Sequence, residues 1–251
     1  MKRRLFFFLA LLFLLCAPAC RSPSAHGSIA PPRTELFNEA IAVPIPFPSE
    51  KGALLPVPAL CQYPTLPTGC EATAAAMVLQ FYGEEISPEA FAKDWLSCSE
   101  DFYSYFGKSY GPDPNKVFAG DPFSSNAYGC FEGPIADAVR RNSSACTAEI
   151  LEGRTLEDLC TDYIDEGMPL LIWATSSMRA SEPGNSWYLD HKTPFTWIAG
   201  EHCLVLVGYD EQFYFLNDPA SGSTVGYQKA VVEKRFAELG SRALLITPRA
   251  S

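Results

Sequence analysis

The amino-acid sequence predicts an α+β domain in which helices precede a set of paired antiparallel strands. Helical patterns begin near Cys70, Ser87 and Thr155, each beside residue types that favour helix starts. Two later β-rich runs, 202–209 and 213–217, are separated by three polar residues, which is a hairpin signal. A chain of 251 residues with no visible internal repeat is expected to form one domain with additional segments outside it.

Residues 1–19 have the features of a signal peptide and are not expected to belong to the fold. Lys2, Arg3 and Arg4 form a positive n-region, and an unbroken apolar run over 5–15 follows it. The run is too short to cross a bilayer as a permanent helix. We therefore expect an exported protein of the cell envelope.

Small residues stand directly before Cys20, in the sequence Ala17-Pro18-Ala19. This pattern is similar to a bacterial lipobox, although Ala17 stands where a leucine is usual. It predicts that Cys20 carries acyl chains such as palmitate, which hold a lipoprotein on the membrane surface without crossing it. The same residues also form an A-x-A site for ordinary signal peptidase, which leaves a secreted or periplasmic soluble protein as the alternative.

The stretch 20–54 is predicted to be a lipidated or flexible tether, because no hydrophobic period is sustained in it. The folded domain is expected over 55–249. Without residues 1–19 the chain keeps 16 Lys and Arg against 29 Asp and Glu. Such an acidic surface is a poor nucleic-acid binder, so no nucleic-acid partner is expected.

The segment Thr68-Gly69-Cys70-Glu71 is predicted to be a capping box, with Thr68 as the N-cap of a buried helix that ends before Gly83. Cys70 then lies in the first helical turn. There the free backbone N–H groups and the helix dipole favour a thiolate and lower the thiol pKa. The alternative is a core or disulfide cysteine beneath a helix cap.

Ser87 followed by Pro88 predicts a second helix, reaching about residue 96. The passage 98–133 is rich in aromatic residues and glycine, and we expect it to be a long loop. Loops of this length inside a compact domain tend to be functional. We favour a role as a wall of the substrate site over the alternative, a surface loop that its aromatic side chains hold in place.

The remaining elements follow from local patterns. Residues 134–141 form an amphipathic helical pattern, and Thr155-Leu156-Glu157-Asp158 is a second candidate capping box for a helix that ends at Gly167. A strand is expected at 170–174, a helix at 231–239 and a last strand at 243–247.

The predicted hairpin brings a histidine and an aspartate together at its open end. If Tyr209 pairs with Phe213, His202 lies opposite Ala220 and diagonal to Asp218 on the same face. An imidazole beside a carboxylate is the base that a thiol nucleophile needs. Considered alone, a histidine at a strand end such as His202 more often makes ordinary hydrogen bonds within the fold than takes part in catalysis. An aspartate before proline, such as Asp218, more often begins a turn. Their joint occurrence with Cys70 favours a catalytic triad.

Gln62 lies eight residues before Cys70. Its side-chain amide is a candidate donor to the oxyanion of a tetrahedral intermediate, together with the backbone N–H of Cys70. A donor of this kind contributes roughly 3 kcal/mol to transition-state binding.

Six further cysteines leave the disulfide pattern open, because an exported chain allows up to three bridges with fifteen connectivities. They are Cys61, Cys98, Cys130, Cys146, Cys160 and Cys203. A zinc site is disfavoured, because no C-x-x-C pair occurs and only His191 and His202 follow residue 26. No metal or organic cofactor is expected.

Over about 55–245 the chain resembles the papain-like cysteine peptidases of the bacteriocin-processing, double-glycine-peptidase-like group, in a stand-alone exported form. The segments that carry the resemblance are Gln62 with TGCEAT (68–73), PDPNKVFAGDP (112–122), GMPLLIW (167–173), EHCLVLVGYD (201–210) and NDP (217–219). The chain order of cysteine, histidine and aspartate agrees with the papain-like plan.

The resemblance implies a papain-like fold, in which an N-terminal helix carrying Cys70 packs on an antiparallel sheet carrying His202 and Asp218. It implies Cys70 as nucleophile, His202 as general base and acid, Asp218 as the residue that orients His202, and Gln62 in the oxyanion hole. Two features depart from the family. Extra cysteines flank the motifs at Cys61, Cys130 and Cys203, and the absence of a transporter domain means that cleavage after a double glycine does not carry over.

The expected function is therefore that of an exported cysteine peptidase or amide hydrolase, which acts on a peptide or protein substrate through a thioester at Cys70. Two alternatives stay open. The same triad performs acyl transfer if an amine outcompetes water. A non-catalytic peptide-binding lipoprotein of the cell envelope would keep the fold without the reaction.

Overall fold

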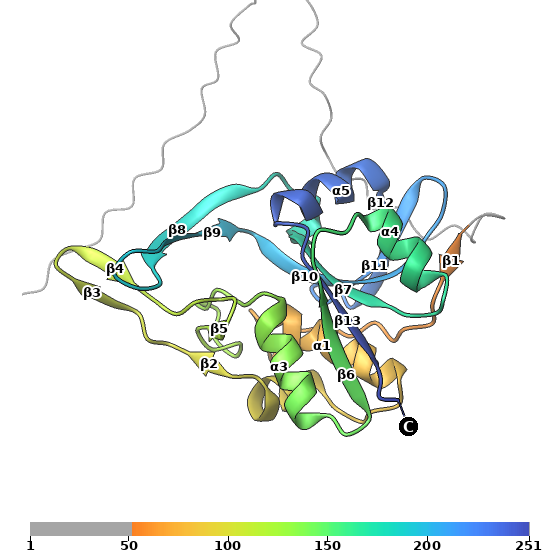
Figure 1. The fold of residues 1–251 in the computed structure, drawn as a ribbon, viewed down its shortest axis with the longest axis horizontal. Coiled ribbons are helices and arrows are strands. Elements are labelled where there is room, and N and C mark those ends of the chain that lie inside the picture. The colour runs from red at the N-terminus through yellow and green to blue at the C-terminus, as the bar shows by residue number, and fades with distance from the viewer. Residues whose placement is uncertain (1–51, 251) are drawn as a thin grey trace, which may run out of the picture. The chain divides into compact units, whose positions relative to one another are not determined.

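The computed structural model describes residues 52–250 (Figure 1). The signal peptide predicted at 1–19, the lipidation site predicted at Cys20 and the tether up to residue 51 lie outside the described residues. Within 52–250, no helix is both long enough and apolar enough to span a membrane.

The core of the fold is a seven-stranded sheet, all of whose strand pairs are antiparallel. Its strands are β1 (Ala53–Leu54), β6 (Cys146–Leu151), β7 (Leu170–Thr175), β10 (Glu201–Tyr209), β11 (Phe213–Asp218), β12 (Ser223–Gln228) and β13 (Ala243–Pro248). The order is β12-β11-β10-β7-β13-β6, and β1 pairs with β10 (Figure 1). The α+β class is confirmed.

Helices cover both faces of this sheet. The first face packs against α1 (Cys70–Phe81) and α3 (Glu132–Asn142), and the second against α4 (Leu156–Leu159), the π-helical turn Cys160–Ile164 and α5 (Lys229–Glu238). Side chains alternate along each strand, so Trp173 and Val205 face α1 while Ile172 and Leu204 face α5. Burial on both faces explains why β7 and most of β10 are continuous apolar runs.

Helix α1 begins differently from the prediction. Its N-cap is Gly69, which has no side chain to cap with, and the Thr68 hydroxyl donates to carbonyl oxygens of the loop 121–124, among them Ser124 at 2.9 Å. The capping box at Thr68 was therefore wrong, because Glu71 bonds to Cys130 N in the interior instead of turning back. The helix end was right: Gly83 follows the C-cap residue with φ +85°.

The other two helix starts are confirmed by their hydrogen bonds. The Ser87 hydroxyl accepts from Ala90 N at 3.1 Å, and it opens α2 (Pro88–Ala90), which continues as the π-helical turn Phe91–Trp95. Thr155 makes both bonds of a capping box with Asp158. Local sequence signals suffice here because every partner lies within three residues.

The aromatic passage 98–133 holds more structure than the predicted loop. It contains β2 (Cys98–Ser99), β3 (Tyr103–Tyr105), β4 (Lys108–Tyr110) and β5 (Phe118–Ala119). Strands β3 and β4 join β8 (Glu182–Tyr188) and β9 (Pro194–Ala199) in a second sheet of order β3-β4-β8-β9, and β2 pairs with β5. These strands are short and several find their partners far along the chain, which no local pattern indicates. A 3₁₀ turn, Ser176–Met178, follows β7.

The β10–β11 hairpin has the predicted register at its open end. Leu206 faces Leu216 and Val205 faces Asn217, which puts His202 diagonal to Asp218. At the turn Tyr209 pairs with Tyr214, one residue later than predicted, and a β-bulge between Leu206 and Gly208 absorbs the difference.

Candidate active site

His202 and Asp218 form the polar pair predicted from the hairpin. His202 Nε2 lies 2.7 Å from Asp218 Oδ1, and both residues are buried. Burial would raise the pKa of Asp218, but the hydrogen bond and charge of His202 and the amides of Ala220 and Ser221 outweigh it and lower that pKa. The contact with Asp218 orients the ring through Nε2 and leaves Nδ1 as the nitrogen available to exchange a proton.

Cys70 is the first residue of α1, and only 6% of its surface is exposed. Helix α1 packs along β10, and the backbone of Cys203 lies near enough to the Cys70 sulfur to act on the pKa of its thiol. The structure therefore brings the sulfur to the strand residue that follows His202. In this arrangement the thiol donates to Glu71 Oε2 at 3.2 Å, while the imidazole pairs with Asp218.

The pKa expected for Cys70 needs correction. Burial, followed by the nearby carboxyl groups Glu71 and Glu201, raises the pKa of the Cys70 thiol well above its usual value, and the backbone of Cys203 offsets only part of this. The helix N-terminus was expected to lower it. That expectation was wrong because desolvation and two neighbouring carboxyl groups outweigh the dipole of one helix.

Glu71 and Glu201 are site residues that the sequence interpretation missed. Glu71 Oε1 accepts from Cys130 N at 2.6 Å while Glu71 Oε2 accepts from the thiol. Glu201 Oε1 is buried and finds no hydrogen-bond partner among residues 52–250. A usable signal was present, because Glu71 directly follows the candidate nucleophile and Glu201 directly precedes His202.

Cys70, Glu71 and Glu201 are also the group that comes nearest to a metal site in the described residues, with ligand atoms within 4.8 Å of one another. We assign no metal to it, because both oxygens of Glu71 already accept hydrogen bonds from the protein. The arrangement instead allows a proton to be held between the Cys70 sulfur and Glu71 Oε2.

Gln62 lies beside the turn that follows Asp218, because Gln62 N donates to Pro219 O at 2.9 Å. Its side-chain Nε2 donates to Leu66 O and Pro67 O, both at 3.1 Å. Both amide hydrogens are thus used within the loop that leads to Cys70. The residue is 4% exposed, and its role in an oxyanion hole stays a prediction.

The seven cysteines in the described part of the chain are all free. None of the disulfides that the sequence allowed forms there, so Cys70 is not held in a cross-link. Cys130 and Cys203 are buried thiols near Glu71, and burial raises the pKa of each.

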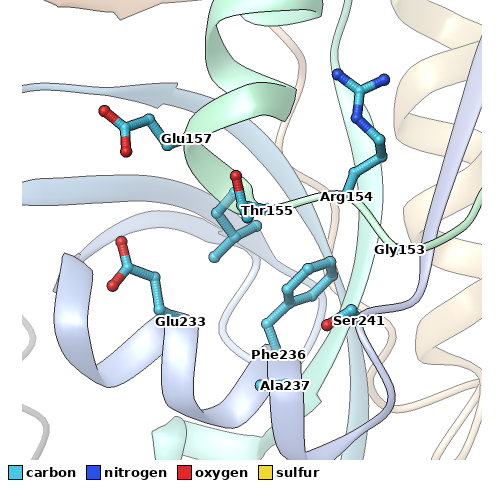
Figure 2. A pocket seen from close by; sticks show the side chains of 9 residues that line it. Gly153, Arg154, Thr155, Glu157, Glu233, Phe236, Ala237 and Ser241 are labelled. Atoms are coloured by element: carbon cyan, nitrogen blue, oxygen red, sulfur yellow. The ribbon is translucent and has the colours of Figure 1, made fainter.

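Two cavities lie outside this group of residues. One, of about 410 Å³, lies between α4 and α5 and is lined by Arg154, Glu157, Glu233 and Phe236, with none of the predicted site residues (Figure 2). The other, of about 520 Å³, lies along β3, β4 and β8. We call this second cavity the aromatic trough; it is lined by Phe102, Tyr103, Ser104, Ser109, Tyr110, Asn126, Tyr128, Asn185, Ser186 and Trp187.

The aromatic trough adjoins the buried carboxyl groups through the chain at Tyr128 and Gly129. The Tyr128 ring packs 4.8 Å from Trp187, and Asn185 Nδ2 donates to its hydroxyl at 2.9 Å. The next residue, Gly129, has room only for a hydrogen, because an added β-carbon would lie 2.5 Å from Glu71 Oε1 and 3.2 Å from Glu201 Oε2. The passage 98–133 thus supplies both a wall of the trough and part of the site's surroundings.

A buried helix with a cysteine at its first position, set against an antiparallel sheet that carries a His–Asp pair, defines the papain-like cysteine peptidase class. Residues 54–244 match the family model described as "Peptidase_C39 like family". The chain belongs to this family, which confirms the resemblance and supports a function of the cysteine peptidase type.

Three known proteins are similar to the chain. The uncharacterized protein YvpB of Bacillus subtilis (strain 168) is 25% identical over 186 residues, which are 73% of this chain and 70% of YvpB. A crystal structure from Bacillus anthracis, described as a candidate C39-like peptidase, has TM-score 0.69 and 24% identity, and covers 80% of this chain and 100% of its own. It shows the same fold. Xylellain, a cysteine protease from Xylella fastidiosa, aligns over 88% of this chain and 95% of its own at TM-score 0.35 and 14% identity, a likeness too low to bear on the site.

Proposed function

We propose that the chain is an exported cysteine peptidase that hydrolyses a peptide bond through Cys70, His202 and Asp218. The observation that supports this most is that strand β10 meets both Asp218 and the Cys70 sulfur at two consecutive residues. His202 Nε2 contacts Asp218 Oδ1 at 2.7 Å, and the backbone of the neighbouring Cys203 lies near the Cys70 sulfur.

In the proposed reaction the Cys70 thiol gives up its proton, which reaches His202, and the sulfur attacks the scissile carbonyl carbon. The C–N bond then breaks and a thioester forms on Cys70. The leaving amine takes a proton from His202, and the imidazole then draws a proton from the water that hydrolyses the thioester. Asp218 holds the imidazole in the required tautomer and stabilises the imidazolium. Its lowered pKa suits this part, because it stays charged throughout.

The backbone N–H of Cys70, at the start of α1, is one candidate donor to the oxyanion. Gln62 is the second. To donate, its amide exchanges the bond to Leu66 O or Pro67 O for one to the substrate. Substrate binding then shifts the loop 62–67 that precedes the nucleophile.

We propose a peptide or protein as the substrate, with the aromatic trough as one wall of its binding site. Tyr103 and Phe102 are 57% and 40% exposed and offer apolar surface next to neutral hydroxyl and amide groups. The acidic composition of the chain favours substrates that carry positive charge.

Export and anchoring at the membrane surface through Cys20 are proposed from the sequence of residues 1–20. Mass spectrometry of the N-terminal peptide from the native host tests this, with an acylated Cys20 as the expected result. Cys20→Ala should release the protein from the membrane fraction. An unmodified N-terminus after cleavage would leave the secreted or periplasmic soluble protein.

The peptidase proposal is tested with a fluorogenic peptide library, using the wild type, Cys70→Ala and the exposed-cysteine control Cys61→Ala. Wild type and Cys61→Ala should cleave the same peptides and Cys70→Ala none. Mass spectrometry of the product with and without added amines separates hydrolysis from acyl transfer.

The binding-protein alternative has one observation in its favour, the buried and protonated state of Cys70. It predicts that iodoacetamide labels Cys70 no faster than an unfolded thiol even with a peptide bound, and that Cys70→Ala preserves the biological role. Both results together would overturn the peptidase proposal.

A further inference from the structure

A thiol and two carboxyl groups share one buried site beneath the candidate nucleophile. Cys70 Sγ donates to Glu71 Oε2 at 3.2 Å, and a ligand atom of Glu201 lies within 4.8 Å of both groups. The backbone at Gly129 closes the site on its other side. It lies so near that an added β-carbon would be 2.5 Å from Glu71 Oε1 and 3.2 Å from Glu201 Oε2.

Only one of the two carboxyl groups carries a charge near neutral pH, because like charges this close in a buried site do not both ionise. Burial and the charge of Glu71 raise the pKa of Glu201 well above its usual value, and Arg242 offsets part of that. The charged member is Glu71, whose oxygens accept from Cys130 N and from the thiol.

The ionisable and polar groups that face Glu71 come from four parts of the chain: Cys70 on α1, Cys130 before α3, Glu201, His202 and Cys203 on β10, and, through Glu201, Arg242 before β13. Arg242 is itself paired with Glu132 at 2.7 Å. No cation therefore contacts Glu71 directly among the described residues.

We propose that Glu71 is a further catalytic residue, which accepts the Cys70 thiol proton as the sulfur attacks, with Glu201 as a positioning residue held neutral beside it. The inference rests on the proposed function. In this step the S–H bond breaks, an O–H bond forms on Glu71 Oε2, and the electron pair left on sulfur forms the bond to the carbonyl carbon. The proton then moves to His202, which delivers it to the leaving amine.

The environment of Glu71 suits a base that works at neutral pH. Burial raises the pKa of Glu71 to about 7, against the lowering effect of the Cys130 amide, the thiol and His202. A general base is most effective when its pKa lies near the operating pH. No ordinary surface glutamate meets this condition.

The test measures the rate at which iodoacetamide modifies Cys70 between pH 5 and 9.5 in the full chain, by mass spectrometry of the Cys70 peptide. This readout needs no peptidase substrate. The variants are Glu71→Gln, Glu201→Gln, His202→Ala and the exposed control Glu85→Gln, each first checked for folding by thermal unfolding.

In the wild type and in Glu85→Gln the rate should rise through a step near pH 7. Glu71→Gln should remove the step and slow labelling at pH 7.5 by at least about tenfold. Glu201→Gln, which imitates the neutral acid, should stay within about threefold of the wild type. The step should persist in His202→Ala, because the first proton acceptor is still present.

Two results would overturn the inference. One is a step that survives in Glu71→Gln, or labelling of that variant at pH 7.5 as fast as in the wild type. The other is loss of the pH step in His202→Ala, which would assign the step to the imidazole. The His202→Ala measurement tests the inference even if Glu71→Gln does not fold. The expected labelling profiles without cleavage of any peptide would reject the proposed function, and would leave Glu71 only as the proton acceptor of the Cys70 thiol.

Discussion

His202 Nε2 and Asp218 Oδ1 lie 2.7 Å apart across the β10–β11 hairpin, and Asp218 Oδ1 also accepts from Ala220 N at 2.8 Å. The carboxylate is thus fixed by its own turn before it fixes the imidazole. A bulge near the closed end of the hairpin sets the register that brings the two side chains together.

Asp218→Asn should therefore keep the fold and lose most of the hydrolysis rate, on the order of 10²- to 10⁴-fold, because an amide stabilises the wrong imidazole tautomer. Peptide hydrolysis and thermal unfolding are measured together. Asp137→Asn, at an exposed position on α3, is the control and should match the wild type. Equal rates in both variants would remove Asp218 from the mechanism.

Gln62→Ala should lower both stability and rate. The change removes two hydrogen bonds to Leu66 and Pro67, which costs about 1–2 kcal/mol of unfolding free energy. Urea unfolding and hydrolysis are compared with Gln80→Ala, because Gln80 also bonds a loop carbonyl, that of Ile86, at the far end of α1. Gln80→Ala should lose stability alone. A Gln62→Ala enzyme with full kcat would exclude Gln62 from oxyanion binding.

Gly129→Ala should destabilise the fold by roughly 1–3 kcal/mol and impair the site, because its β-carbon clashes with Glu71 Oε1 at φ +145°. Gly153→Ala is the matched control: its φ is +66°, but no atom lies within 4 Å of the added carbon. It should show backbone strain without an effect on Cys70 labelling. The same labelling rate in both variants would mean that Glu71 tolerates displacement.

The pH dependence of stability should show the raised pKa of Glu71. A carboxyl group whose folded pKa is raised from 4.5 to about 7 binds more protons in the native than in the unfolded state between these values. Its contribution is fully present below about pH 4.5 and is lost as the pH rises through 7. The unfolding free energy should fall by on the order of 2–3 kcal/mol over that window.

Urea unfolding at pH 4.5, 6 and 8 measures this fall. Glu71→Gln should flatten the profile, since an amide does not titrate, and Glu85→Gln should leave it unchanged. A profile of Glu71→Gln that runs parallel to the wild type would show that Glu71 has an ordinary pKa.

The sequence by itself determined the features whose causes are local. The caps at Ser87 and Thr155 and the end of α1 at Gly83 depend on partners a few residues away. The two-residue period of strands placed His202 near Asp218, although the turn pairs one residue later than predicted and a bulge restores the register. Position alone also placed Cys70 in the first turn of a buried helix, although the helix begins one residue later than the predicted cap implied.

Only the tertiary structure decided what surrounds the sulfur. Glu71 looked like a capping residue, but its partner is Cys130, 59 residues away. Glu201 comes from strand β10, which lies much later in the sequence. The pKa of Cys70 follows from desolvation and from these charges, which depend on burial and long-range contacts. The sheet β3-β4-β8-β9 was missed for the same reason, because its pairing joins segments that the chain separates widely.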